Sequence, residues 1–132
     1  MITVTAAIIM DAEKVLITKR RDEGSTSGLW EFPGGKTEGH ESLEQCLRRE
    51  IKEELNINIR VRKYFRESVF QSEKATYRIM AFFAKLISGD IQLNVHDEAK
   101  WVDIADLNQY SFLPADVTFV QSLQKRLSKT TQ

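Results

Sequence analysis

Three glutamates close together in the sequence, Glu50, Glu53 and Glu54, could bind a metal ion. They lie in the segment Ser42–Leu55, whose apolar residues recur every three or four positions, and this spacing predicts an amphipathic helix. On one side of such a helix, each like-charged pair three or four positions apart costs roughly 0.2–0.5 kcal/mol. A divalent cation removes this repulsion, and carboxylates with room for water and phosphate suit Mg²⁺. The pattern therefore indicates a metal-binding helix.

The alternative interpretation is a solvated helix face held by ion pairs such as Arg49 with Glu53. The segment just before the helix, Trp30–Lys36, favours the metal site, because it contains two consecutive glycines, Gly34 and Gly35. Glycine lets the backbone approach a phosphate closely or expose a carbonyl to a metal. The glycine turn and the acidic helix together therefore predict a site for metal and phosphate.

Strands and helices alternate around this segment. Residues Ile2–Met10 alternate between apolar and polar, which predicts a strand with one face buried. Thr76–Ile87 is apolar on both faces, as expected of a central strand. A closing helix is predicted from Val117. These elements predict a mixed sheet between helices, an α/β/α sandwich. The other predicted elements are strands at 15–18, 57–61 continuing into 63–70, 91–95 and 99–104, a polar loop at 22–28, an irregular segment at 106–111 and a frayed C-terminal tail.

Composition sets the class of protein. With 132 residues, 42% of them apolar, the chain is predicted to form a single domain over 1–132. Nineteen basic residues balance nineteen acidic ones, so no broad field recruits a nucleic acid polymer or a membrane surface. A small nucleotide is compatible with this balance, and the oligomeric state is left open as monomer or homodimer.

The remaining residue counts concern compartment and packing. Cys46 is the only cysteine, so no intramolecular disulfide can form, and its place on the apolar stripe predicts a packing role. The sequence has neither a signal-peptide pattern nor a stretch of transmembrane length, and we therefore expect a cytoplasmic protein. His40 and His96 are far apart in sequence and are expected to be surface or loop residues rather than metal ligands.

The order of residues from 35 to 57 resembles the Nudix box: Gly, five residues, Glu, seven residues, then Arg-Glu, an aliphatic residue, any residue, Glu-Glu, any residue, Gly and an aliphatic residue. Every defined position matches except Asn56, which stands in place of the box glycine. Asparagine is the next best residue for a left-handed helix end, so the helix should still end there. His40 also replaces a frequent glycine. The resemblance implies the Nudix α/β/α sandwich.

The resemblance also implies a chemistry. Nudix enzymes cleave a diphosphate bond in a nucleoside diphosphate linked to another group, using Mg²⁺ or Mn²⁺ and water. By position in the box, the metal ligands are the carbonyl of Gly35 and the carboxylates of Glu50, Glu53 and Glu54. Glu50 or Glu53 is the candidate general base, and this choice stays open. Arg49 pairs with Glu41 and ties the loop to the helix.

Many members add an acidic ligand from a later loop, six residues before a tryptophan like Trp101. Here that position is Val95. Either Asp97 or Glu98 serves instead, with Glu98 the predicted metal ligand, or the site lacks this ligand. The alternative interpretation of residues 96–98 is a solvated turn.

The resemblance extends to the MutT-like branch, which shares the segment WEFPGGK at 30–36 and an Asn or Asp at position 116. It implies substrate-binding roles for Arg20, Phe32, Gly34, Lys36 and Asp116. Asp116 would hydrogen-bond the nucleobase, whereas its alternative role is to cap the last helix. A carboxylate accepts hydrogen bonds, which suits cytosine or a guanine-like base, so 8-oxo-dGTP diphosphatase and CTP pyrophosphohydrolase activities both stay open.

The function predicted from the resemblance is Mg²⁺-dependent hydrolysis of a nucleoside triphosphate to the monophosphate and pyrophosphate. A second enzyme class is a diphosphatase acting on ADP-ribose, a dinucleotide or a nucleotide sugar. A third possibility is a nucleotide-binding sensor without catalysis, which the retained carboxylates at 41, 50, 53 and 54 disfavour.

Overall fold

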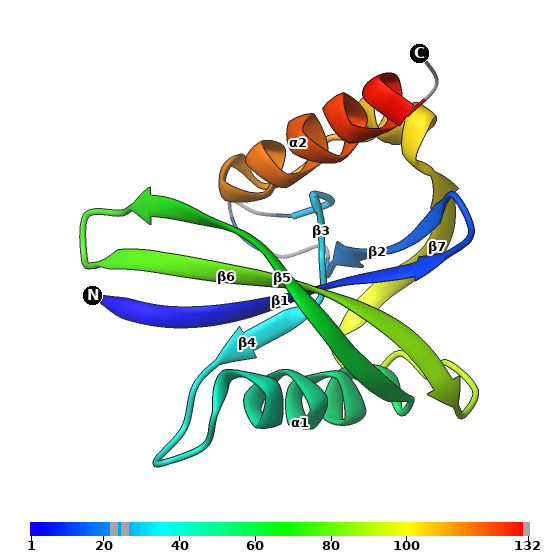
Figure 1. The fold of residues 1–132 in the computed structure, drawn as a ribbon. Helices are drawn as coiled ribbons and strands as arrows, with labels where there is room; N and C mark the ends of the chain where they lie inside the picture. The colour runs from blue at the N-terminus through cyan, green and yellow to red at the C-terminus, as the bar shows by residue number, and fades with distance from the viewer. Residues whose placement is uncertain (22–23, 25–26, 131–132) are drawn as a thin grey trace.

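A mixed β-sheet with an α-helix on each side forms the fold (Figure 1). The computed structural model describes residues 1–21, 24 and 27–130, so residues 22–23 and 25–26 of the predicted polar loop and residues 131–132 of the predicted tail lie outside the described residues. The elements are β1 (Ile2–Asp11), β2 (Lys14–Arg20), β3 (Trp30–Glu31), β4 (Gly34–Lys36), α1 (Leu43–Leu55), β5 (Asn58–Gln71), β6 (Thr76–Ser88), β7 (His96–Asp103), the 3₁₀ helix η2 (Ile104–Gln109) and α2 (Pro114–Thr130).

Strand β1 joins the parts of the sheet. On one side, β1 pairs in parallel with β6 from Ile2 to Ile9. It also pairs antiparallel with β4 in its first half and with β2 at its last two residues. The strand order is β3-β2-β1-β6-β5, with β7 on the free side of β2. The predicted central position of β6 is confirmed, because β6 lies between β1 and β5.

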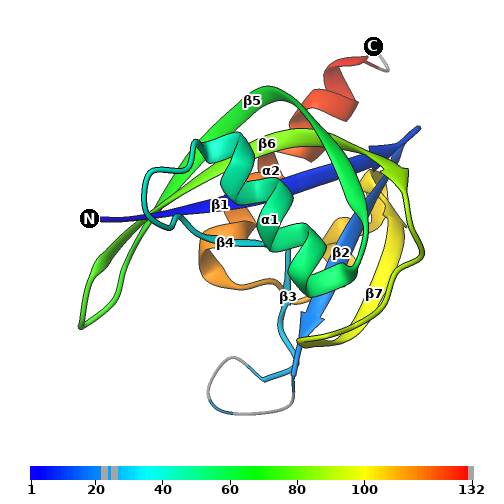
Figure 2. The ribbon, with the colours of Figure 1, turned by 90° about the horizontal axis from the view of Figure 1, so that it is seen from below.

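The two α-helices lie on opposite faces of the sheet (Figures 1 and 2). Each face carries a separate apolar core under its helix. In β1, Ala6 and Ile8 belong to the core that contains α2 residues, and Ala7 and Ile9 to the core that contains α1 residues. The prediction that only one face of this strand is buried was therefore wrong. The threonines at its start suggested a solvated face, but both helices pack on the strand beyond them.

Helix α1 begins and ends as the sequence predicts. The hydroxyl of Ser42 accepts a hydrogen bond from the Gln45 amide, and the Gln45 side chain accepts one from the Ser42 amide, which makes a capping box. At the other end, Asn56 adopts a left-handed conformation with φ 60°, so asparagine does replace the box glycine. Cys46 is fully buried, which confirms its packing role.

The predicted strand at 91–95 is irregular, and the reason is tertiary. The backbone amides of Gln92 and Asn94 donate to the carbonyls of Leu55 and Glu54, and the Asn94 side-chain amide donates to a third carbonyl of α1. These are carbonyls that a helix C-terminus leaves without partners inside the helix. The segment therefore satisfies the end of α1 instead of pairing with the sheet.

Three further expectations need correction. His96 is buried in β7 rather than placed at the surface. Helix α2 begins at Pro114, earlier than the predicted Val117, since proline is well suited to a first helical turn. A 3₁₀ helix lies where an irregular segment was expected after β7. Within the described residues, no helix has the length and apolar character needed to span a membrane.

Replacing Ser42 by alanine should lower the free energy of unfolding by about 1 kcal/mol, because the substitution removes the oxygen that caps α1. Urea unfolding of Ser42→Ala against the parent chain measures this difference. Ser111→Ala, an exposed serine outside the helix starts, is the control and should change stability by less than about 0.5 kcal/mol. Equal stabilities for the Ser42 variant and the parent would contradict the capping role.

Candidate active site

The guanidinium of Arg49 connects the acidic residues of α1 with the glycine turn. Its Nε and Nη2 donate to the two oxygens of Glu41 at 3.0 and 2.6 Å, and Nη1 lies 2.9 Å from Glu50 Oε1 and 3.3 Å from Glu53 Oε2. Nη2 also donates to the carbonyl of Lys36. The hydrogen bonds from Arg49 are the main reason that the pKa of Glu41 is lowered to about 2. The predicted Arg49–Glu41 pair is therefore present.

Gly34 and Gly35, which the sequence predicted as a turn, lie in strand β4, and both stand where a side chain would collide with a neighbour. A Cβ on Gly34 would meet the backbone of Thr5 on β1, and one on Gly35 would meet the carboxyl group of Glu50. The carbonyl of Gly35 accepts a hydrogen bond from the Thr5 hydroxyl at 3.2 Å. The glycines thus allow β4 to pair with β1 and allow Glu50 to lie directly against the turn.

Glu54 on α1 differs from the other predicted ligands in having a buried oxygen atom that no hydrogen-bond donor contacts among the described residues. This atom is Oε1. Burial, followed by the charges of Glu31 and Glu50, raises the pKa of Glu54 to about 8. A buried carboxylate oxygen without a donor fits a site for a cation. In the described part of the chain, no three His, Cys, Asp or Glu side chains are arranged so that they could hold a metal ion together. Two of the predicted ligands, Glu50 and Glu53, are in contact with Arg49.

A cavity of about 650 Å³ opens beside the turn. Its apolar wall includes Phe32, which stacks on Phe112 with ring centroids 5.4 Å apart. At one end lies Asp116, whose Oδ2 accepts a hydrogen bond from the Phe32 amide at 2.9 Å. Burial raises the pKa of Asp116 to about 8, although this hydrogen bond opposes the shift. Asp116 is the third residue of α2 and bonds to Phe32, so its alternative role as a helix cap is not what the structure has.

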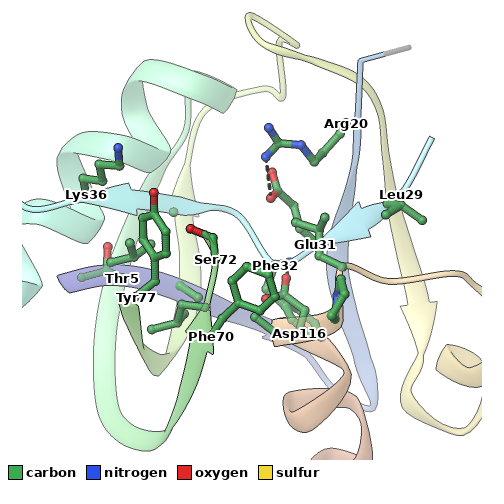
Figure 3. Close-up of a pocket in the computed structure, with 17 residues that line it drawn as sticks. Thr5, Arg20, Leu29, Glu31, Phe32, Lys36, Phe70, Ser72, Tyr77 and Asp116 are labelled. Carbon is green, nitrogen blue, oxygen red and sulfur yellow. Dashed lines mark hydrogen bonds and ion pairs between the residues drawn. The ribbon is translucent and has the colours of Figure 1, made fainter. Parts of the chain in front are cut away.

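The five predicted substrate-binding residues all line this one cavity, although they lie up to 96 positions apart in the sequence (Figure 3). Strand β4 joins the cavity to the acidic helix, because the Lys36 carbonyl accepts from Arg49 while the Lys36 side chain lines the cavity. The ammonium group of Lys36 also lies 5.9 Å from the ring centre of Tyr77. The five residues are Arg20, Phe32, Gly34, Lys36 and Asp116.

Comparison with known proteins decides the family. The model of the NUDIX domain family matches residues 1–123. The chain belongs to the Nudix family. It is 34% identical to the CTP pyrophosphohydrolase of Escherichia coli (strain K12) over 122 residues, which are 92% of this chain and 90% of the relative. It is 30% identical to the 8-oxo-dGTP diphosphatase of Buchnera aphidicola subsp. Schizaphis graminum over 124 residues, 94% of each chain.

Solved structures agree with this assignment. The solution structure of the E. coli ORF135 protein matches with a TM-score of 0.82 at 32% identity and covers 94% of this chain and 89% of that one. The MutT protein from Methanosarcina mazei Go1 has the same fold, with a TM-score of 0.82 at 23% identity over 99% of this chain and 96% of that one. The chain is thus a Nudix hydrolase with a mixed sheet between helices.

Glu98, the predicted later ligand of this Nudix domain, does not lie with the box carboxylates. Lys19 on β2 has a partner on each neighbouring strand, Glu98 on β7 and Trp30 on β3. Residues directly opposite one another share a face of the sheet, and Trp30 belongs to the core of α2. Glu98 is therefore exposed on the face away from α1. Its neighbour Asp97, at the irregularity in β7, is also exposed.

Two residues of the site were missed in the sequence, Glu31 and His96. Glu31 lines the cavity, and its Oε1 and Oε2 lie 3.2 Å from Arg20 Nη1 and 2.8 Å from His96 Nε2. Glu31 stands inside the segment WEFPGGK, and this was a signal that could have identified it. Nothing local in the sequence pairs it with His96, which lies 65 positions away.

Replacing Glu54 by glutamine should leave the metal-free Nudix domain as stable as the parent or more stable, because glutamine carries no charge, whereas burial disfavours the ionised Glu54 strongly enough to raise its pKa to about 8. The rise in Tm that the parent is expected to gain from Mg²⁺ should be largely lost. Thermal unfolding with EDTA and with Mg²⁺ measures both effects. Glu44→Gln, an exposed glutamate on the first turn of α1, is the matched control. An equal Mg²⁺-induced rise in Glu54→Gln would contradict the metal site.

Proposed function

We propose that this Nudix hydrolase is a cytoplasmic, Mg²⁺-dependent nucleoside triphosphate pyrophosphohydrolase, which releases a nucleoside monophosphate and pyrophosphate. The observation that carries the proposal is the direct link between two halves of the site. A cavity with a buried carboxyl group, Asp116, lies beside a helix on which one buried oxygen of Glu54, Oε1, has no hydrogen-bond partner among the described residues, and one strand borders both. The relatives named CTP pyrophosphohydrolase and 8-oxo-dGTP diphosphatase support a triphosphate substrate.

In this proposal, the metal is held by the carboxylates of Glu50, Glu53 and Glu54 and by the carbonyl of Gly35. When bound, Mg²⁺ neutralises charge on the phosphoryl oxygens and lowers the pKa of a coordinated water. Mn²⁺ is a possible substitute, since Nudix hydrolases generally use divalent ions. Glu50 or Glu53 accepts the proton of the attacking water, and Arg49 keeps these side chains in place through its contacts with both.

The phosphate chain of the substrate passes from the cavity toward α1 in this proposal. Arg20 and Lys36 line the cavity and provide positive charge for the phosphates. At Gly34 the backbone lies directly against β1, where there is no room for a side chain. Phe32 forms the apolar wall beside the base.

Asp116 would then select the base by its protonation state. Because its pKa is raised to about 8, the carboxyl group is mostly protonated at neutral pH and can donate one hydrogen bond and accept another. This pattern matches a base edge with an acceptor beside a donor. Cytosine has such an edge at N3 and N4. 8-oxoguanine has one at O6 and N7, whereas guanine has acceptors at both of these atoms, and the proposal takes this edge of the purine as the one that Asp116 contacts. The proposal therefore covers (d)CTP and 8-oxo-dGTP and disfavours dGTP.

The deciding experiment measures pyrophosphate release with Mg²⁺ for 8-oxo-dGTP, dGTP, CTP, dCTP, 5-methyl-dCTP and ADP-ribose. We expect kcat/KM for 8-oxo-dGTP or for a cytosine nucleotide to exceed that for dGTP by at least about tenfold, which corresponds to one good hydrogen bond of about 1.4 kcal/mol. The double variant Glu53→Gln/Glu54→Gln is the inactive control. Turnover of ADP-ribose alone would refute the proposed triphosphate substrate.

The raised pKa of Asp116 also predicts a pH-dependent stability. Between the unfolded value near 4 and the folded value of about 8, the folded chain binds more protons than the unfolded chain, so stability falls as the pH rises through this range. Asp116→Asn stays neutral and should lose this contribution. Urea unfolding between pH 5 and 9 measures the difference, with the exposed Asp103→Asn as control. Parallel stability curves for the parent and Asp116→Asn would rule out the burial effect.

A further inference from the structure

Glu31 is held on the face of the sheet that carries α1. Strand pairing places it opposite Thr18 on β2, and the Thr18 hydroxyl donates to the Glu31 carbonyl. Its side chain is only 17% exposed, yet it lines the cavity, where it points toward Arg20 (Figure 3). Arg20 and His96 stand opposite one another on β2 and β7, so three strands bring these side chains together.

Both oxygens of Glu31 are oriented by donors from different strands. Arg20 contacts Oε1 at 3.2 Å from β2, and His96 contacts Oε2 at 2.8 Å from β7. The His96 side chain is only 3% exposed, and its second nitrogen, Nδ1, is buried without a hydrogen-bond partner in the described part of the chain. Leaving a buried nitrogen without a partner costs roughly 1–3 kcal/mol, so His96 is not placed there for stability alone.

Glu31 also acts electrostatically on the acidic helix. Among the charges that raise the pKa of Glu54, Glu31 is the largest contributor, ahead of Glu50 on the same helix. The two carboxylates are therefore near one another, as the position of Glu31 on the face that carries α1 requires. The position where other family members carry an acidic ligand is the exposed Val95, and Glu98 lies on the opposite face. Glu31 is thus a carboxylate from outside the helix that strand pairing places on the face of α1 and that two donors hold in one orientation.

We propose that Glu31 is the acidic residue that this Nudix domain supplies to its divalent metal from outside the box helix, and that His96 is the positioning residue for Glu31. The proposal rests on the metal site of the proposed function. Each carboxylate oxygen has two lone pairs, so Glu31 can keep its bonds to Arg20 and His96 while a free lone pair coordinates the metal or accepts a hydrogen bond from a water on it. Carboxylates that bind a metal are in turn hydrogen-bonded by surrounding groups, and Arg20 and His96 supply such bonds to Glu31.

Titration with Mn²⁺ alone, without nucleotide, tests this assignment through the free-ion signal in electron paramagnetic resonance. Glu31→Gln keeps the shape but loses the charge, and it should weaken Mn²⁺ binding by about tenfold or more. Glu98→Gln, an exposed carboxylate on β7, is the matched control and should bind as the parent does. Unchanged Mn²⁺ affinity in Glu31→Gln, equal weakening in both variants, or no Mn²⁺ binding by the parent would each overturn the proposal.

Two substitutions of His96 test its positioning role. His96→Gln can still donate from its Nε2 to Glu31 and should retain most of the Mn²⁺ affinity, whereas His96→Leu cannot donate and should lose it toward the level of Glu31→Gln. Thermal unfolding without metal identifies any variant that fails to fold. If Glu31→Gln is unfolded, Glu31→Asp replaces it, because aspartate keeps the charge but withdraws the oxygens, and it should weaken Mn²⁺ binding by about threefold or more. Equal affinities for the two His96 variants would refute the positioning role.

The two proposals can fail separately. If the parent binds Mn²⁺ through Glu31 but hydrolyses no triphosphate, the proposed substrate fails and the role of Glu31 stands. If triphosphates are hydrolysed and Mn²⁺ binding is independent of Glu31, the substrate proposal stands and the role of Glu31 is wrong.

Discussion

The repulsion among the carboxylates at the start and along one side of α1 is the constraint on which the site depends. A single guanidinium, that of Arg49, contacts Glu41, Glu50 and Glu53, and it also reaches the Lys36 carbonyl. The arrangement requires a turn without side chains, because Glu50 occupies the space that a Cβ on residue 35 would fill. Glu50, whose charge Arg49 balances, is therefore also the residue that requires glycine at position 35.

Strand β4 transmits this arrangement to the substrate cavity. Its three residues pair with the first half of β1, while β2 pairs only with the last residues of that strand. The cavity is lined by residues from both of these parts of the sheet and from the first turn of α2. A metal on the helix and a base in the cavity would thus be held at the two ends of one rigid segment, as cleavage of a phosphate chain between them requires.

Local patterns in the sequence predicted much of this arrangement, and their failures have a common origin. The period of α1, its end at Asn56 and the apolar faces of β6 are local properties, and the structure has them as predicted. The segment 91–95 has strand-like composition, yet its amides bond to the C-terminal carbonyls of α1. The buried second face of β1 and the bond from Phe32 to Asp116 likewise depend on elements distant in sequence.

The sequence by itself determined the acidic helix, because spacing along a helix directly specifies which side chains share a face. Its motifs determined the family and, through the resemblance to that family, five residues of the cavity. Only the tertiary structure decided which partners hold the Glu31 carboxylate. Glu31 and His96 meet because β3 and β7 lie on either side of β2 in a particular register, and a shift of one residue would turn either side chain to the other face. Strand register arises from contacts across the whole sheet, so no local pattern could have revealed this pair.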